Sequence, residues 1–465
     1  MDTEPITVRS LLIHHSGLPG DREINQFTQE PYEHFSVVLN HYKNEFTAYP
    51  PGYVWAYCNL GYNLLGVIIE RVSGMTYEDY IHQNIFKPLG MLNTAVSRAD
   101  IPADFYSKAY RTKTNSSYWL SHFRDRPAGG LLSSVYEMSL FMRMVLNNGT
   151  FKGEHILQQG TLEQMLTAQN GDIPLDVGFK LGLGWYLDRV CLRYAGRYCG
   201  HGGDFATAHT LMSLLPDHKL GVIVTANTDT AATMVREIAD LTLQLALEIK
   251  TGLGPPEENL KMGKLSENQL HEFEGLYATK FGLYRIKADN GQLKIKIDEG
   301  GGRIPWLTLI RNSDGWFSVR YPFFTIPHFR KVKYPLHVIP SIRIFIRKIG
   351  NKKYMYIEKN EDQYPIGESF DKKPIPDTWL KRTGNYKVVN HDPLIDTNKY
   401  HDWQLTLEDD ILFFKIKNKL VIEPINDHEA IILCLGRNCY ETIHFKTKNG
   451  QEFIEYAGLK YKKDT

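Results

Sequence analysis

The stretch Tyr53-Val-Trp-Ala-Tyr57-Cys-Asn59-Leu-Gly61-Tyr-Asn-Leu-Leu-Gly66 decides how the first half of this chain is interpreted. From Asn59 to Ser73 apolar residues recur four positions apart, and Gly74 follows as a natural helix stop. The sequence therefore predicts a helix over 59–73, with Tyr57 just before it. A half-buried tyrosine beside an N-capping asparagine would explain the tripeptide equally well, so Tyr-x-Asn alone is a weak functional signal.

A second motif, His201-Gly202-Gly203-Asp204, opens a stretch predicted to form strands. Residues 209–216 and 220–227 read as an antiparallel hairpin with its turn at Asp217-His218. Glycine weakens a strand, so two in succession usually mean that something approaches the backbone closely. A substrate lying along this strand would approach the backbone in this way. For the isolated triplet, a glycine-rich turn with a surface histidine is the alternative.

Helices are predicted before and after these strands. Thr76-Tyr-Glu-Asp79 resembles a capping box and starts a helix that ends by Pro88. Ser134-Val-Tyr-Glu137 is a better capping box, and its helix ends at Asn147-Asn-Gly149. A further helix runs from about 230 to 250. Its apolar stripe comprises Met234, Ile238, Leu241 and Leu245. Antiparallel strands with helices on either side indicate an α+β architecture.

Together the two motifs resemble the second and third motifs of the serine β-lactamase and penicillin-binding-protein superfamily, in its class C-like branch. The resemblance covers about residues 5–250 and implies a β-lactamase-related domain over residues 1–250, with an antiparallel sheet flanked by helices. It implies that Tyr57 is the general base and Asn59 the group that orients the substrate. A phenol serves as a base only where neighbouring cations favour its anion.

In the third motif, the resemblance makes His201 an electrostatic helper. The backbone N–H of Asp204 matches the family's second oxyanion donor, and Gly202 and Gly203 belong to the strand along which the substrate would lie. Each oxyanion donor contributes about 3 kcal/mol to transition-state stabilisation. The family resemblance implies no metal and no organic cofactor.

The family's first motif, Ser-x-x-Lys, carries the nucleophile and should lie upstream of the stretch Ile6 to Pro19. Only five residues precede Ile6, so a domain incomplete at its N-terminus is expected. The Ser-x-x-Lys pattern at Ser369-Phe-Asp-Lys372 lies far out of family order and is interpreted as chance. We therefore expect no nucleophile in this chain, little or no activity from it, and apolar surface left exposed by the missing strands and helix.

Beyond residue 250 the texture of the sequence changes. A Gly- and Pro-rich linker occupies 251–265, and an all-β, barrel-like C-terminal domain is predicted over 266–465. Its hairpins are marked by turns such as Asn290-Gly291 and Asn449-Gly450. This part resembles, more loosely, lipocalin-like barrels appended to some serine peptidases and esterases. Phe273-Glu-Gly-Leu-Tyr277 is echoed by Lys381-Arg-Thr-Gly-Asn-Tyr386, which leaves open one barrel or a duplicated half.

Composition excludes several function classes. A formal net charge of +1 over 465 residues gives no field for nucleic acid or anionic membrane. No stretch is apolar enough for a membrane span, and no secretory signal is visible. Neither His14 nor His15 has partners at metal-ligand spacing, so packing or capping roles are favoured. The five cysteines could pair as 191/199 or 434/439, but free buried thiols are the favoured interpretation.

The leading hypothesis is a serine hydrolase that acts through an acyl-enzyme on an ester, amide or peptide bond, with a small-molecule or peptide substrate. The rival is a non-catalytic binding or scaffold protein that uses the same cleft. A third alternative places the function in the C-terminal barrel, as a ligand or partner module. Substrate identity, compartment and oligomeric state are not indicated by the sequence.

Overall fold

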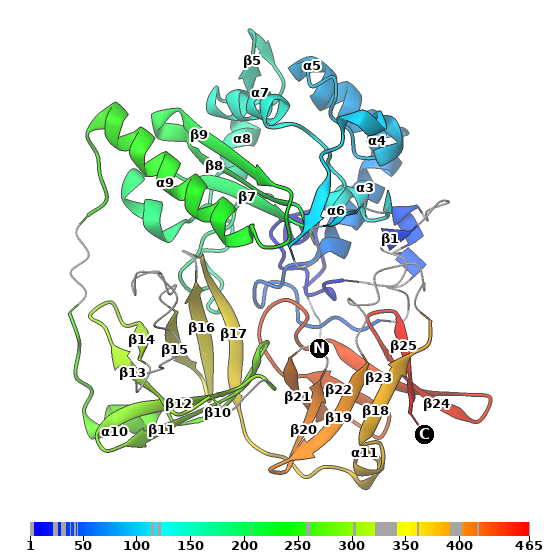
Figure 1. Ribbon diagram of the computed structural model, residues 1–465, viewed down its shortest axis with the longest axis vertical. Coiled ribbons are helices and arrows are strands. Elements are labelled where there is room, and N and C mark those ends of the chain that lie inside the picture. Colours follow the sequence, from blue (N-terminus) through cyan, green and yellow to red (C-terminus); the bar gives the residue numbers. More distant parts are fainter. Residues whose placement is uncertain are drawn as a thin grey trace. The chain divides into compact units, whose positions relative to one another are not determined.

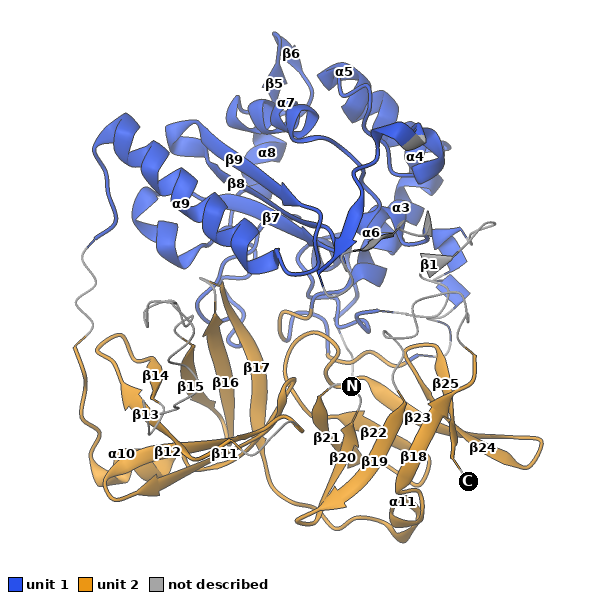
Figure 2. Cartoon of the chain, viewed as in Figure 1, with its two compact units in different colours: residues 1–45, 50–53, 57–257 blue, residues 46–49, 54–56, 258–465 orange. Residues whose placement is uncertain are grey.

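The computed structural model describes residues 4–464, apart from 22–26, 29–33, 38, 41–42, 44, 113–115, 119–121, 206, 257–260, 301–303, 321–341, 360–361, 391–401 and 416–417. Part of the predicted linker, 257–260, thus lies outside the described residues. Figure 1 traces the chain, and Figure 2 colours its two compact units. Unit 1 comprises residues 1–45, 50–53 and 57–257, and unit 2 the remainder. Within the described ranges, no helix has the length and apolar character needed to cross a membrane.

Unit 1 is built on a three-stranded antiparallel sheet in the order β7-β8-β9. The strands are β7 (Cys199–Asp204), β8 (His209–Leu215) and β9 (Leu220–Ala226), and α9 (Ala232–Thr251) covers one face (Figure 1). On the other face, Met212 and Leu214 join a larger apolar core cluster. The predicted α+β fold and the predicted hairpin are confirmed.

The helix that follows the first motif is α3 (Asn59–Ser73), which ends at Gly74 in the left-handed conformation, φ 71°. Its N-cap is Cys58, whose sulfur accepts a hydrogen bond from Gly61 N–H. Cys58 is 1% exposed and is therefore a packing and capping residue. Asn59 is the first helical residue and not the cap, so its side chain is available for another role.

The two predicted capping sites are used differently. Thr76 caps α4 (Tyr77–Ile81) through Asp79 N–H, and the helix continues as η2 (His82–Phe86) and α5 (Lys87–Leu89). Ser134 caps α7 (Val135–Leu146). The reciprocal half of that capping box is absent.

The buried carboxylate of Glu137 instead accepts hydrogen bonds from Asn93 N–H and from the Thr94 hydroxyl. A tertiary contact has therefore replaced the local one that the sequence predicted.

The predicted apolar stripe of α9 faces solvent and not the core. Residues that pack inward are Val235, Ala239, Leu243 and Leu247. Residues of the predicted stripe are between 45% and 59% exposed: Met234, Ile238, Leu241 and Leu245. The helix is apolar on two sides, so periodicity alone could not choose between them. Apolar side chains are therefore exposed along the outward side of this helix.

The remaining elements of unit 1 are short. They are α1 (Val8–Leu12), β1 (Phe27–Thr28), η1 (Phe35–Val37), η3 (Arg98–Asp100), η4 (Ala103–Phe105), β2 (Ala109–Arg111), β3 (Ser116–Tyr118), β4 (His122–Phe123), α6 (Arg126–Gly129), β5 (Thr150–Phe151), β6 (Glu154–His155), α8 (Gln159–Met165), η5 (Val190–Ala195) and η6 (Pro216–His218).

Two glycines of α3 provide a matched test of how tightly it packs. A Cβ on Gly66 would overlap Pro127 of α6 and lie 3.0 Å from Phe35 Cε2, whereas a Cβ on Gly61 would meet Leu11 at an ordinary 3.4 Å. We expect Gly66→Ala to lower the free energy of unfolding by about 1–3 kcal/mol through overpacking. Gly61→Ala should leave it unchanged or raise it by up to about 1 kcal/mol. Urea unfolding measures both, and equal stability of the two variants would contradict the packing described.

Unit 2 contains two closed eight-stranded barrels, not one (Figure 1). The first barrel follows α10 (Glu267–Phe273) and comprises β10 (Gly275–Thr279), β11 (Gly282–Asp289), β12 (Gln292–Asp298), β13 (Leu307–Arg311), β14 (Phe317–Arg320), β15 (Arg343–Ile349), β16 (Lys352–Lys359) and β17 (Asp362–Phe370). The second follows α11 (Asp377–Lys381) and comprises β18 (Gly384–Val388), β19 (Trp403–Glu408), β20 (Ile411–Lys415), β21 (Lys419–Pro424), β22 (Glu429–Ile432), β23 (Thr442–Lys448), β24 (Gln451–Tyr456) and β25 (Leu459–Lys463).

The sequence echo corresponds to a hydrogen-bonding arrangement that is repeated at the start of each barrel. The Tyr277 hydroxyl donates to the Phe273 carbonyl, and the Tyr386 hydroxyl donates to the Arg382 carbonyl, both at 2.7 Å. The glycines that open the two first strands have φ of 147° and 143°. In both barrels a lysine of a later strand also donates to a carbonyl just before the first strand. The duplicated alternative is therefore the correct one.

Side chains fill the first barrel, whose core cluster includes Tyr277, Ile295, Phe317 and Met355. Eight strands give an interior just wide enough for such filling.

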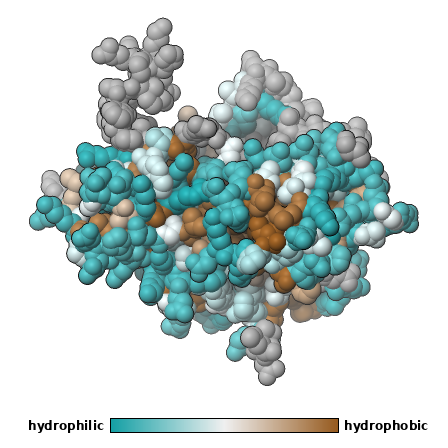
Figure 3. Space-filling view, turned by 90° about the horizontal axis from the view of Figure 1, so that it is seen from below, coloured by the Kyte–Doolittle hydropathy of each residue, from teal (hydrophilic) through white to brown (hydrophobic). Residues whose placement is uncertain are grey.

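The free-thiol interpretation is wrong for one pair, because Cys434 and Cys439 form a disulfide with their Cα atoms 5.1 Å apart. The loop between these two cysteines turns at Gly436, whose φ is 100°. The spacing of the cysteines in the sequence did not indicate that turn. Among the described residues, Cys58, Cys191 and Cys199 take part in no disulfide. The face drawn in Figure 3 is mainly hydrophilic, with apolar patches between.

Candidate functional site

Tyr57 lies just before the α3 N-cap, in an aromatic cluster of unit 1. Its ring centroid is 4.0 Å from that of His14 and 6.4 Å from that of His201. His14 has a φ of 58° and accepts a hydrogen bond from Cys58 N–H at 3.1 Å, so it braces the start of the helix. The two motifs, far apart in the sequence, thus meet in space.

Two further tyrosines complete this aromatic cluster. The Tyr62 ring stacks on His14 at 5.0 Å, and the Tyr186 ring lies 5.3 Å from His201. Burial, with a smaller contribution from neighbouring Tyr57, raises the pKa of Tyr62 far above its ordinary range. Its hydroxyl donates to the Leu12 carbonyl at 3.0 Å, so Tyr62 is a neutral structural phenol. Sequence reasoning missed Tyr186, since nothing in its local pattern marks it.

Asn59 is held by a loop that precedes it by almost 40 positions. Its side-chain amide donates to Asp21 Oδ1 at 2.7 Å, and its backbone N–H donates to the Gly20 carbonyl at 3.1 Å. These bonds fix the side chain at the first turn of α3. No local pattern around Asp21 marks it for such a role.

β7 is an edge strand of the three-stranded sheet, and its last four residues are His201, Gly202, Gly203 and Asp204. On the side away from β8, Gly200 exchanges both backbone hydrogen bonds with Tyr186, at 2.9 and 3.0 Å. Backbone groups of an antiparallel strand alternate between its two edges. The N–H groups of Gly202 and Asp204 therefore face the same outer edge as that of Gly200, and an extended ligand could bond to them there.

Two glycines of β7 are present for different reasons. A Cβ on Gly200 would overlap the Tyr198 hydroxyl and lie 2.7 Å from the Met212 carbonyl, so packing requires this glycine. A Cβ on Gly203 would meet nothing within 4 Å. Because side chains alternate along a strand, that Cβ would point to the same face as the His201 ring. The fold itself therefore does not explain Gly203, whereas close approach by a ligand would.

The electrostatics of His201 differ from those of a fixed cation. Burial lowers the pKa of its imidazole below the ordinary 6.5, although a hydrogen bond to the Gly202 carbonyl opposes the shift. That bond, from Nδ1, is 2.6 Å long. The ring is therefore neutral at pH 7 and donates through Nδ1, which leaves Nε2 as an acceptor.

This direction of shift predicts a pH dependence of stability. The unfolded chain takes up a proton at His201 before the folded chain does, as the pH falls through 6.5. The His201 contribution to stability is thus fully present above pH 6.5, and is lost progressively between 6.5 and the lower pKa of the folded state. We expect His201→Gln to lose less stability than the wild type between pH 7.5 and 5.5, measured by urea unfolding. A folded-state pKa of 6.5 or more, from NMR titration of the ring, would contradict it.

The Asp204 carboxylate belongs to the same residue as the backbone N–H that is the expected oxyanion donor. Its Oδ1 accepts from His209 Nδ1 at 2.7 Å, and its Oδ2 from Arg236 Nη2 at 2.8 Å. The carboxylate is half exposed, at 45%. Neither His209 nor Arg236 was selected from the sequence.

Ser369 lies on β17, in a strand and not on a helix. Its hydroxyl accepts a hydrogen bond from Lys353 N–H at 2.9 Å, while Lys372 approaches Asp410. Ser-x-x-Lys chemistry needs both groups on one helical turn, three positions apart. This geometry agrees with reading the pattern as chance.

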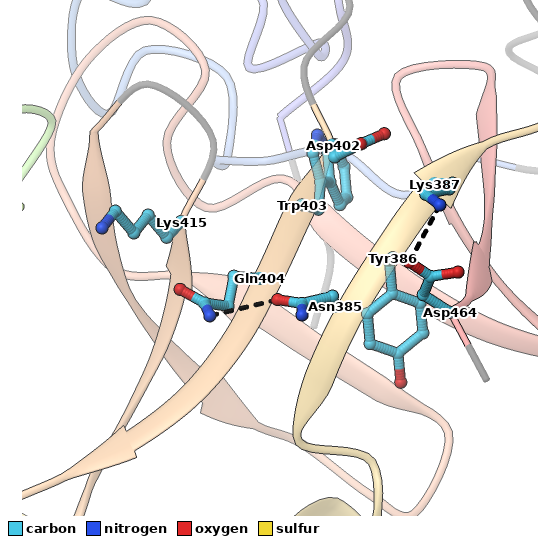
Figure 4. Close-up of a pocket in the computed structure, with 8 residues that line it drawn as sticks. All are labelled: Asn385, Tyr386, Lys387, Asp402, Trp403, Gln404, Lys415 and Asp464. Atoms are coloured by element: carbon cyan, nitrogen blue, oxygen red, sulfur yellow. Dashed lines mark hydrogen bonds and ion pairs between the residues drawn. The ribbon is translucent and has the colours of Figure 1, made fainter.

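A hollow of about 360 Å³ opens on the second barrel (Figure 4). Its lining is polar, and two pairs of lining side chains already bind each other: Lys387 with Asp464 at 2.9 Å, and Gln404 with Asn385 at 3.1 Å. It contains none of the residues of the two motifs. Among the described residues, no three His, Cys, Asp or Glu side chains gather in the way a metal site requires.

Comparison with curated proteins finds distant relatives. The chain is 26% identical over 246 residues to Penicillin-binding protein 4* of Bacillus subtilis (strain 168), which covers 48% of this chain and 51% of that protein. It is 28% identical over 228 residues to the mitochondrial serine beta-lactamase-like protein LACTB of Mus musculus, covering 43% of this chain and 41% of that protein. The chain thus spans about half the length of these relatives, or less.

Among solved structures, the crystal structure of SurE is similar with a TM-score of 0.51 and 21% identity, over 77% of this chain and 78% of that one. At this identity the likeness concerns the fold alone. The family model described as Beta-lactamase matches residues 1–247, more than half of the chain. The chain therefore belongs to the beta-lactamase family.

Proposed function

We propose that unit 1 supplies most of the active site of a serine hydrolase that works through an acyl-enzyme on an ester, amide or peptide bond. The observation that carries the proposal is the approach of the Tyr57 and His201 rings, 6.4 Å apart, beside a strand edge with a glycine that the fold does not need. The nucleophilic serine and its lysine would come from polypeptide outside these 465 residues. The alignments cover 51% and 41% of two relatives, so each of these proteins has further sequence outside the part that matches this chain.

In the proposed reaction, the lysine that accompanies the serine provides the cation that favours the Tyr57 phenolate. Tyr57 then takes the proton of the serine hydroxyl as the serine oxygen attacks the substrate carbonyl carbon. The bond to the leaving alcohol or amine then breaks, and the leaving group receives that proton. In the second half, water gives a proton to Tyr57 as its oxygen attacks the acyl carbon. The ester bond to the serine then breaks, the serine oxygen takes that proton, and the acid is released. Asp204 N–H stabilises the oxyanion, Asn59 orients the substrate, and neutral His201 provides an acceptor near the phenol.

The second candidate is a non-catalytic binding protein that uses the same strand edge. One observation favours it: the Ser-x-x-Lys pattern at residues 369–372 begins on a strand of the first barrel and not on a helix, so it does not supply the nucleophile. The barrel alternative has less support, because side chains fill the first barrel and pair with one another in the hollow of the second.

The test is covalent labelling of the full-length gene product with a fluorophosphonate or penicillin-type probe, followed by peptide mapping. We expect labelling on a serine outside the 465 residues, and none on the 465-residue chain. Labelling of Ser369 would contradict the site assignment. Absence of labelling together with tight, reversible binding of the probe would favour the binding protein.

A further inference from the structure

The end of β7 is held by the Asp204 carboxylate and its two donors, His209 and Arg236, which together are called the tether. The role inferred for this tether rests on the proposed function. Gly202 and Gly203 have no side chains with which to fix the backbone, and a Cβ on Gly203 would touch nothing. Glycine also loses more conformational freedom on folding than any other residue. A strand that lets a ligand approach at two glycines therefore loses its own anchoring at the same place.

An oxyanion donor is effective only if it is already in place before the charge develops. The Asp204 N–H follows directly after the two glycines, so its position must be set from elsewhere. The Asp204 side chain is the first along this strand that can do so. It reaches one donor on the neighbouring strand, His209, and one on the covering helix, Arg236.

The tether is ionic. Burial acts to raise the pKa of Asp204, but hydrogen bonds from His209 and Arg236 outweigh it and hold the pKa below the ordinary range. The carboxylate therefore remains charged at neutral pH. Arg236 is itself fixed, since its Nη1 donates to the Ala232 carbonyl one helical turn before, at 3.1 Å.

His209 shows that this arrangement is not simply optimised for stability. The residue is 7% exposed, and its Nε2 is buried without a hydrogen-bond partner in the described part of the chain. An unsatisfied buried polar atom costs about 1–3 kcal/mol. An apolar residue would avoid that cost, but it could not donate to Asp204.

We propose that Arg236 and His209 are positioning residues: acting through the Asp204 carboxylate, they hold the β7 backbone so that the Asp204 N–H is aimed at the substrate edge. Neither side chain needs to touch the substrate. The role of the pair is to replace, from α9 and β8, the rigidity that the glycines remove.

The first experiment is amide hydrogen exchange on the 465-residue chain, which needs no catalysis. We expect Arg236→Met to speed exchange of the Gly203 and Phe205 amides by about tenfold through easier local opening, since Gly203 pairs with Thr210 of β8 and Phe205 N–H donates to the Ala208 carbonyl. Arg236→Lys should keep part of the protection, because it retains the charge without the planar fork. Arg197→Met is the control. Arg197 is an exposed arginine just before β7, bound to Asp217 at 2.7 Å. Unchanged exchange in Arg236→Met would overturn the proposal.

The second experiment measures the acylation rate of the full-length gene product. Arg236→Met should slow acylation about 100-fold, the loss expected for one oxyanion donor, with little change in KM. His209→Leu should slow it without lowering Tm, because the unsatisfied nitrogen is removed with the tether. A rate no slower than that of Arg197→Met, or a Tm loss that parallels the rate loss, would overturn the positioning role.

The two failures can be told apart. If the full-length product shows no Tyr57-dependent acylation, the proposed function fails. The exchange comparison then decides by itself whether Arg236 and His209 hold the end of β7.

Discussion

Tyr57→Phe is expected to slow acylation of the full-length gene product by a factor of about 100 to 10,000, the range typical for loss of a general base. Removal of the hydroxyl leaves the ring and its contacts with His14 and His201, so the fold should be preserved. KM should change little, because the proton is transferred only in the transition state. Stopped-flow kinetics with a chromogenic ester or lactam measures the effect.

Tyr62→Phe is the matched control for that experiment. It removes another hydroxyl from the same aromatic cluster, one that donates to the Leu12 carbonyl. We expect it to lower the free energy of unfolding by about 1 kcal/mol and to leave acylation within a few-fold of wild type. Equal losses of rate in the two variants would mean that Tyr57 acts through packing and would remove it as the base.

Gly203→Val is expected to reduce acylation about 100-fold, because a branched side chain would occupy the face along which the substrate carbonyl must approach. Stability should be unchanged or slightly higher, since a Cβ there meets nothing and β-branched residues favour strands. Urea unfolding of the 465-residue chain tests stability, and probe labelling of the full-length product tests access.

Gly200→Ala, on the same strand, should behave in the opposite way. Its Cβ would overlap the Tyr198 hydroxyl, so we expect a loss of about 1–3 kcal/mol in the free energy of unfolding. A Gly203→Val protein that is labelled at the wild-type rate would show that no substrate passes over this residue.

The sequence was informative where chemistry needs particular residues at fixed spacing. Tyr57 and His201 were found from separate motifs, and the structure places their rings in one cluster. The helix over 59–73 was predictable, because its apolar period and its glycine stop agreed, although its N-cap is Cys58 and not Asn59. The hairpin turns at Asn290-Gly291 and Asn449-Gly450 were predictable too, since few residues tolerate their positive φ.

The sequence was uninformative where a tertiary partner decides. The outward face of α9 has the same period as its inward face, and only packing on β8 and β9 distinguishes them. Asp21, His209 and Arg236 are ordinary polar residues until the fold brings them to Asn59 and Asp204. Their roles depend on long-range contacts that no local pattern encodes.

The doubled barrel also determines the order in which unit 2 can assemble. Each barrel closes by pairing its last strand with its first, Leu276 with Phe370 in one and Tyr386 with Lys463 in the other. The hairpins between them form from neighbouring residues, whereas closure must wait for segments far apart along the chain, at a higher entropic cost. Nascent barrels therefore present two unpaired edges until their final strand arrives, and this is the stage at which they are most exposed to association with other chains.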